Sequence, residues 1–395
     1  MRRVLRLAAA AALLVLACSP SARAQSRWLA GYLQTVPLWT GTTALAEGHL
    51  SDFNRFRLTI EPVFGRVAGE VVYEQATTFR TQGAMAGFGL GSVQGGGEYL
   101  DLQWTLSERE HVLWRHRFDR LKVGWRPTDA VELSLGRQAV SWGTTLFLTP
   151  ADPFIPFNPA DPFREFRAGV DAARVRMSPS PLSEIDVVVR PTRTAAGEEM
   201  TALARGLVTW RNWELSGWGG SLYGDAAGAF GASGAIGAWA VRGEAVVREV
   251  RDQVIVRGTV GVDHLQQVLG RDLSFLFEYQ HDGLGASSPD DYLIVSLSDP
   301  SRRGELQVLG RDEAVIQAAY KLHPLWSLSG LWLWNLNDRS ALLAPSVGYS
   351  ASDEISIAGG VYFGIGDAES TLARPLPSEH GLLSTTAYVS ISWYF

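Results

Sequence analysis

Residues 386–395 read TAYVSISWYF, and this stretch decides the fold class. Apolar or aromatic side chains occupy every second position from Ala387 to Phe395, and Thr, Tyr and Ser side chains fill the positions between them. A period of two indicates a β-strand with one apolar and one more polar face. The segment is therefore predicted to be an amphipathic strand that ends on an aromatic residue.

The same alternation returns along most of the chain beyond residue 50. It predicts strands at 383–395, 354–366, 341–351, 326–337, 313–323, 272–281, 253–266, 238–249, 226–236, 213–222, 203–211, 183–190, 166–178, 130–142, 111–126, 66–79 and 53–64. Strands of about 9–13 residues can cross a bilayer at a tilt, whereas strands of soluble proteins most often have about five or six residues. The alternation changes phase between Phe118 and Leu121, which predicts a bulge near Asp119 and Arg120.

The lengths of the connections support one particular architecture. Counted back from the last strand, the long connections all fall at one end of the strands, and short turns such as Ser352-Asp353 fall at the other end; the long ones are 367–382, 282–312, 191–202, 143–165 and 80–110. This alternation is typical of outer-membrane barrels. It needs one further strand, for which 28–40 is the candidate. We therefore predict an all-β fold, a transmembrane antiparallel up-and-down β-barrel of about 16–18 strands, with the lower number if 28–40 or the glycine-rich 226–236 is not a strand.

The composition excludes several other classes of protein. The chain of 395 residues is 46% hydrophobic and 10% aromatic, which is too apolar for a disordered chain. Beyond the N-terminal segment there is no uninterrupted run of about 18 apolar residues, which excludes a helical membrane protein. The net charge of −6 offers no basic surface for a nucleic acid.

The first 24 residues are predicted to be a signal peptide for Sec export, and 25–395 the barrel. Three arginines, Arg2, Arg3 and Arg6, precede an apolar run, and Ala22-Arg23-Ala24 has the small-x-small pattern of a cleavage site. A second interpretation is that Val15-Leu16-Ala17-Cys18 forms a lipobox, which would make Cys18 a lipidated N-terminus. Cys18 is the only cysteine, so cleavage after Ala24 leaves a chain without disulfides or thiolate chemistry.

Two segments carry a resemblance to known proteins. The aromatic C-terminal Phe395 resembles the signal by which Gram-negative outer-membrane barrels are recognised for assembly, which implies the barrel-assembly machinery as a partner and the outer membrane as the location. Residues 136–167 read GRQAVSWGTTLFLTPADPFIPFNPADPFREFR. Its Gly-Arg-Gln, Ser-Trp-Gly and Asn-Pro-Ala-Asp-Pro elements resemble a group of poorly characterised porin-like outer-membrane barrels. That resemblance implies a porin-like barrel and supplies neither a substrate nor catalytic residues.

The Pro-rich part of this stretch, 143–165, is predicted to be a loop because proline cannot donate to a strand ladder. Its aromatic side chains need burial, and the lumen of the barrel is the nearest place. The candidates for a constriction are Trp142, Asp152, Phe154, Phe157, Asp161 and Phe163. In one hypothesis the loop folds inward, and Asp152 and Asp161 pair with Arg137 or Arg164. In the other it caps the outer rim.

A set of charged side chains lies opposite the apolar face of the predicted strands. The candidates for the lumen lining are Arg115, Arg117, Glu132, Arg137, Arg205, Arg242, Glu244, Arg257, Glu278 and Lys321. A charge that faces lipid costs about 2–4 kcal/mol at the midplane of the bilayer, so these side chains are expected to face water or one another. They either create a transverse field across a pore or pair internally, as in any wide barrel.

No catalytic residue, metal site or cofactor is predicted. None of the seven histidines has a ligand-spaced partner in the sequence, and no nucleophile lies beside a base. His281, Asp282, Asp290 and Asp291 lie at the longest predicted outer loop, where they either contact Ca²⁺ or lipopolysaccharide or are simply solvated. The expected function is a porin-like channel for passive or substrate-selective passage of small solutes. The alternatives are a transporter of lipids or other hydrophobic compounds with 143–165 as a plug, and an outer-membrane hydrolase.

Overall fold

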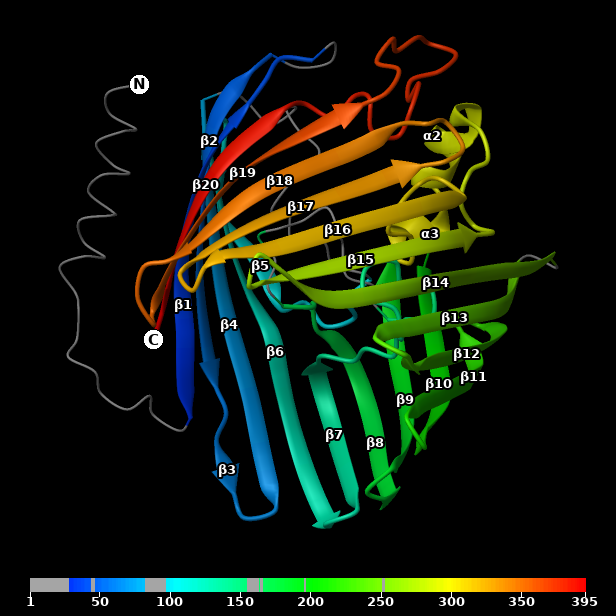
Figure 1. The fold of residues 1–395 in the computed structure, drawn as a ribbon. Helices are drawn as coiled ribbons and strands as arrows, with labels where there is room; N and C mark the ends of the chain where they lie inside the picture. The colour runs from blue at the N-terminus through cyan, green and yellow to red at the C-terminus, as the bar shows by residue number, and fades with distance from the viewer. Residues whose placement is uncertain are drawn as a thin grey trace.

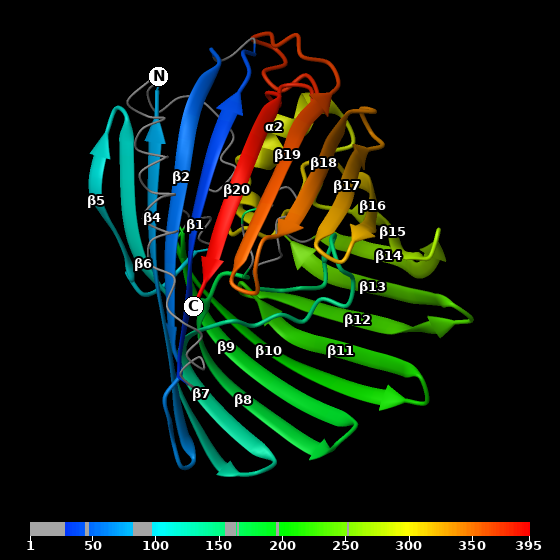
Figure 2. The same ribbon diagram turned by 60° about the vertical axis from the view of Figure 1, so that its left-hand side comes forward.

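The computed structural model describes residues 28–43, 47–81, 97–154, 163, 166–194, 197–250 and 253–395. These residues form one antiparallel sheet that closes into an 18-strand β-barrel (Figures 1 and 2). Its strands are β1 (Leu29–Thr40), β2 (His49–Ile60), β4 (Val67–Arg80), β6 (Val112–Thr128), β7 (Val131–Gln138), β8 (Val170–Ser180), β9 (Ser183–Thr194), β10 (Gly197–Trp210), β11 (Trp213–Leu222), β12 (Asp225–Ile236), β13 (Trp239–Val250), β14 (Gln253–Val268), β15 (Arg271–Asp282), β16 (Asp312–His323), β17 (Trp326–Asn335), β18 (Ala341–Ser350), β19 (Ile355–Ile365) and β20 (Thr386–Tyr394). The predicted signal peptide, 1–24, and Cys18 lie outside the described residues.

Two short strands and three short helices complete the described part of the fold. The strands are β3 (Val63–Phe64), which pairs with β4, and β5 (Gln103–Arg109), which pairs with β6. The helices η1 (Pro289–Asp291), α2 (Tyr292–Ser296) and α3 (Asp299–Arg302) all lie between β15 and β16. Among the described helices, none has the length and apolar character needed to span a membrane.

The barrel closes where β1 pairs with β20 (Figure 2). The backbone N–H of Gly31 donates to the carbonyl oxygen of Phe395 at 2.9 Å, and the N–H of Phe395 donates back to Gly31 at 2.9 Å. A Cβ atom at position 31 would lie 2.6 Å from Cζ of Phe395, so glycine leaves the room for the aromatic ring. The closed ring removes the free edges that an open sheet would expose.

The predicted strands are confirmed, including 28–40 as β1 and the glycine-rich 226–236 as β12. The bulge is also confirmed, because the register between β4 and β6 shifts where Val72 pairs with Arg120 and Tyr73 pairs with Phe118. The prediction of a long connection at 191–202 was wrong, since β9 and β10 extend to Thr194 and Gly197 and pair there. Arg193 and Glu198 form an ion pair across this hairpin at 2.9 Å. Because both are charged, they interrupt the apolar alternation by which a strand is predicted from the sequence.

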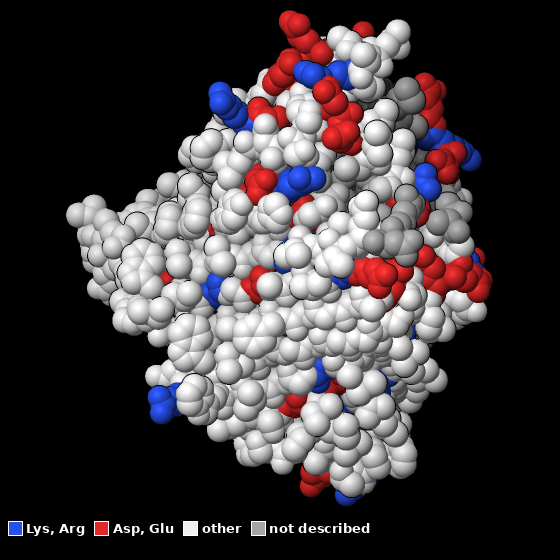
Figure 3. Space-filling view, turned by 90° about the vertical axis from the view of Figure 1, so that its right-hand side faces the viewer, with Lys and Arg blue, Asp and Glu red and all other residues white. Residues whose placement is uncertain are grey.

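The two faces of the wall differ in polarity. Val254, Val260 and Trp210 are 70%, 59% and 59% exposed, and many other apolar side chains face outward with them. Figure 3 shows one side of the molecule, where uncharged residues cover a broad area and most charged residues lie toward the upper and right edges. An exposed apolar surface of this extent needs a hydrocarbon environment, and a closed sheet satisfies its own backbone groups there.

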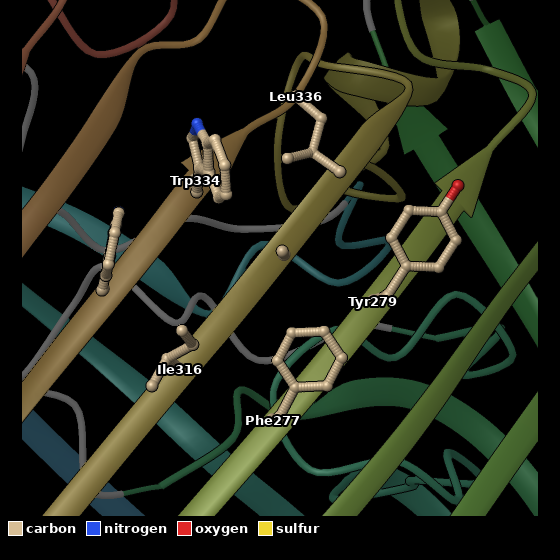
Figure 4. A pocket seen from close by; sticks show the side chains of 7 residues that line it. Phe277, Tyr279, Ile316, Trp334 and Leu336 are labelled. Atoms are coloured by element: carbon tan, nitrogen blue, oxygen red, sulfur yellow. The ribbon is translucent and has the colours of Figure 1, made fainter.

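The outer face also carries a recess of about 400 Å³ (Figure 4). Its lining consists of Phe277, Tyr279, Ala314, Ile316, Trp332, Trp334 and Leu336. All of them except Leu336, which follows β17, alternate along β15, β16 and β17 with Glu278, Val315 and Leu333, which are buried on the inner side. The recess therefore opens to the surroundings of the barrel and is separate from the lumen.

An arginine at Val260, near the middle of β14, is expected to destabilise the barrel in a bilayer. The V260R substitution places a charge on the apolar outer face, at a cost of about 2–4 kcal/mol if the position lies near the midplane. The free energy of unfolding measured by urea titration in liposomes tests this. L269R is the control, since Leu269 is 92% exposed in the turn between β14 and β15. Equal stability of the two variants would contradict an apolar environment around the strands.

Candidate functional site

Nine of the ten charged residues predicted for the lumen lie on the inner face of the wall. These are Arg115, Arg117, Glu132, Arg205, Arg242, Glu244, Arg257, Glu278 and Lys321. Residues directly opposite one another on paired strands share a face. Arg115 thus shares a face with Ala76, which packs on the apolar cluster inside the barrel, and Arg205 shares one with the buried Asp186.

Arg137 differs from the prediction, because it lies on the outer face. It is paired with Leu121, which is 40% exposed, and is in phase with Leu135, which is 63% exposed. The chain segment before β5 covers it: its guanidinium donates to the Leu100 carbonyl at 2.6 Å and pairs with Asp171 at 2.8 Å. Leu133, Leu135 and Arg137 alternate in the sequence, so the period alone already placed Arg137 with the outward residues.

The described first part of the segment between β7 and β8, residues 139–154, folds into the lumen, and two carboxylates of the wall hold it. Glu244 accepts the backbone N–H groups of Thr144, Thr145 and Ala151 at 2.6, 3.0 and 2.9 Å. Glu278 accepts those of Leu146, Phe147 and Leu148 at 2.7, 3.0 and 2.9 Å. A hydrogen bond to a charged acceptor contributes about 1.5–3 kcal/mol. Two acidic residues thus fix the path of this loop across the lumen.

The composition of the loop explains this arrangement. A segment that is interrupted by proline cannot satisfy its backbone groups in a ladder, yet buried N–H groups need acceptors. Glu244 and Glu278 are 5% and 0% exposed. The buried carboxylates and the buried N–H groups therefore satisfy one another.

The aromatic side chains of the loop are buried against the inner wall. The indole N–H of Trp142 donates to Asp186 at 2.8 Å, and the ring of Phe154 packs edge-on against Trp142 with 5.0 Å between centroids. Phe163 packs edge-on against Tyr388 at 4.9 Å, on the opposite part of the wall. Trp142, Phe154 and Phe163 are 1%, 0% and 2% exposed.

Asp152 lies at the turn of the loop and pairs with a residue that the sequence did not indicate. Its carboxylate accepts from the hydroxyl of Ser141 at 2.8 Å and pairs with Arg167 at 2.5 Å, and Arg137 is engaged elsewhere. Burial raises the pKa of Asp152, and the charge of Arg167 opposes this effect. Phe157, Asp161 and Arg164 lie outside the described residues.

The end of the loop packs on a network of ion pairs in the wall. Arg57 pairs with Glu74 at 3.0 Å and with Asp119 at 2.7 Å, and Arg117 pairs with Glu74 at 3.0 Å. The guanidinium of Arg57 also lies 4.6 Å from the ring centroid of Phe166, so the loop covers this network. Much of the lumenal charge is neutralised internally, which favours internal pairing over an unscreened transverse field in this part of the wall.

A second segment, between β15 and β16, also enters the barrel, although it was predicted to be an outer loop. Its Gln307 accepts the N–H of Thr149 at 2.6 Å and donates to the carbonyl of Phe147 at 2.6 Å. Glu305 pairs with the buried Arg248, and its carbonyl accepts from Arg257 at 3.0 Å. The sequence missed Gln307 and Glu305 because a single loop residue carries no periodic signal.

Comparisons with known proteins were made for the whole chain. No protein-family model and no curated protein matches the sequence. Among solved structures, OccAB1 of Acinetobacter baumannii is 11% identical, with a TM-score of 0.57 over 95% of this chain and 99% of that chain. A BenF-like porin from Pseudomonas fluorescens Pf-5 is 9% identical, with a TM-score of 0.57 over 93% and 98%. Pseudomonas aeruginosa OpdK, solved with vanillate, is 10% identical, with a TM-score of 0.52 over 93% and 98%. This chain shares the barrel fold of these structures.

Removal of the Glu278 carboxylate is expected to release the loop from the wall. In E278A the N–H groups of residues 146–148 lose their charged acceptor, and a loss of about 1.5–3 kcal/mol corresponds to amide exchange about 10- to 100-fold faster. Hydrogen exchange of peptides that cover 144–151 measures this. E132A is the control, because Glu132 faces the lumen and pairs with Arg126 rather than with the loop. Unchanged exchange in E278A would show that the carboxylate does not hold the loop.

Proposed function

We propose that this protein is a porin-like channel of a Gram-negative outer membrane, through which small polar solutes pass. The observation that carries the proposal is the stretch 144–151 after β7, which two lumenal carboxylates hold inside a closed barrel with an apolar outer face. A wide barrel leaves an aqueous path unless its own segments fill it. A loop fixed inside the lumen narrows that path and provides a surface for selection.

The similar structures support this proposal by their fold. One of them is described as a porin, and OpdK was solved with vanillate, a small aromatic carboxylate. In this chain, Arg115 and Arg205 face the lumen, and the buried Nε atom of each has no hydrogen-bond partner among the described residues. We infer that the permeant is a small polar molecule, and we assign no catalytic residue.

The cellular route belongs to the same proposal. Residues 1–24 direct Sec export, and the barrel, 25–395, inserts among outer-membrane lipid and lipopolysaccharide with the help of the barrel-assembly machinery through Phe395. The placement of Phe395 at the β1–β20 closure supports a role of this residue in the completion of the barrel.

A second candidate is a transporter of hydrophobic compounds. One observation favours it: Leu148, Phe163 and Val308 form an apolar cluster with lumen-facing residues of the wall such as Val36 and Leu38. An apolar molecule could follow such a surface past the loop.

Liposome swelling with sugars of graded size and with small organic anions separates the two candidates. A channel for polar solutes is expected to give swelling rates that fall as the solute becomes larger, because the narrowed lumen excludes large molecules. Liposomes without protein and liposomes with heat-denatured protein are the controls. An absence of swelling with every polar solute would contradict the channel and favour the transporter of hydrophobic compounds.

Deletion of 150–162 is expected to raise the single-channel conductance, since it removes Asp152 and Phe154 from the lumen. Planar-bilayer recordings measure the change. The substitution E132Q, which alters a lumenal charge away from the loop, is the control and is expected to change the conductance much less. Circular dichroism shows whether the deleted variant keeps its strands. A folded variant with unchanged conductance would reject the loop as the constriction.

A further inference from the structure

Three side chains that can bind a metal meet at the outer rim of the barrel. Glu313 is the second residue of β16, and Glu379 and His380 lie in the connection between β19 and β20. One ligand atom from each of the three lies within 4.8 Å of the other two. The sequence did not predict this group because Glu313 is far from Glu379 and His380 along the chain.

Two members of the group are buried and have unused polar atoms that face it. Glu313 is 0% exposed, and neither of its carboxylate oxygens accepts a hydrogen bond from a donor group of the described residues. His380 is 5% exposed, and its Nε2 atom has no hydrogen-bond partner in the part of the chain that the structure describes. In the described part of the chain, no Lys or Arg forms an ion pair with Glu313 or Glu379. A buried carboxylate without a counter-charge is costly, so this arrangement calls for either a cation or a proton between its members.

The surroundings hold the third member in place. The carboxylate of Glu379 accepts the backbone N–H groups of Leu309 and Gly310 at 2.6 and 2.9 Å and the side-chain amide of Asn335 at 2.7 Å. Asn335 is 0% exposed and also donates to the hydroxyl of Tyr292 at 2.8 Å. Hydrogen bonds of this kind orient the ligands of a metal and are part of a metal site.

We propose that Glu313, Glu379 and His380 bind one divalent transition-metal ion. One imidazole and two carboxylates form a ligand set that suits Zn²⁺ or Mn²⁺, whereas Ca²⁺ prefers a shell of oxygen atoms. Two ligands at about 2.0–2.2 Å from zinc lie at most about 4.4 Å apart, close to the 4.8 Å within which the three ligand atoms lie. The cation would supply the positive charge that the two buried carboxylates require.

The position of the site gives the ion a structural role. It would connect β16 with the segment 366–385, and through Leu309 and Gly310 it would also steady the segment between β15 and β16 that enters the lumen. The ion would thereby fix the outer loops relative to the wall. This inference concerns the rim and does not depend on the proposed channel.

Metal content and thermal stability test the proposal on the full chain in detergent. The protein is treated with a chelator, dialysed against Zn²⁺, Mn²⁺ or Ca²⁺ and analysed by mass spectrometry for bound metal. We expect one Zn²⁺ or Mn²⁺ per chain and a higher Tm with the metal than with the chelator. The variants E313Q and H380Q are expected to lose both the bound metal and the rise in Tm. H281Q is the matched control, because His281 lies at the same rim, is half-exposed and pairs with Asp312; it should keep both.

A shared proton between the two carboxyl groups is the competing explanation, and E313Q distinguishes it. An amide replaces a protonated acid with little change in shape, so under this explanation the wild type binds no metal and E313Q keeps the wild-type Tm. That result would overturn the proposal, as would binding of Ca²⁺ alone or equal zinc content in H380Q and the wild type. None of these readouts requires that the barrel conduct solutes.

Discussion

Buried backbone N–H groups need acceptors, and this constraint shapes the interior of the barrel. The loop after β7 cannot pair as a strand, and its N–H groups find their acceptors on Glu244 and Glu278. Once the loop is fixed in this way, Trp142 and Phe154 reach the inner wall on one side and Phe163 reaches it on the other. The carboxylates are therefore useful as acceptors of backbone hydrogen bonds as well as carriers of charge. This hydrogen bonding sets the space that remains open beside the described part of the loop.

The two faces of the barrel wall differ in polarity, and this difference gathers charged hydrogen-bonding groups in the interior. Its outer face is apolar and its inner face carries most of the charge, so the polarity is reversed relative to a soluble sandwich. Charged side chains inside the barrel lie close together and form ion pairs, as Arg57 does with Glu74 and Asp119. Ion pairs between strands and hydrogen bonds to loops then join parts of the chain that are distant in sequence. The interior becomes a connected polar framework with two apolar clusters inserted in it.

The sequence predicted the strands well because alternation is a local property of the chain, and the phase change near Asp119 reported the bulge for the same reason. It did not predict how far the strands extend at their ends, because the hairpin of β9 and β10 continues through the charged residues Arg193 and Glu198. The sequence also did not predict which side chains meet in the folded barrel. Asp152 pairs with Arg167, and Glu313 meets Glu379 and His380 from a distant segment. A periodic pattern shows which face a residue belongs to, but the neighbour on that face depends on the closed fold.

The β1–β20 seam has a consequence for how the barrel forms. Every other pairing of the described barrel strands joins neighbours along the chain, with only β3 and β5 intervening. Such hairpins need only short loops to close, and their entropic cost is low. The seam instead brings together strands from opposite ends of the described chain, and contacts of this separation slow folding. Assembly should therefore proceed as a growing curved ribbon whose two free edges meet in one late event. Until then, the first and last strands stay open to pairing with another protein.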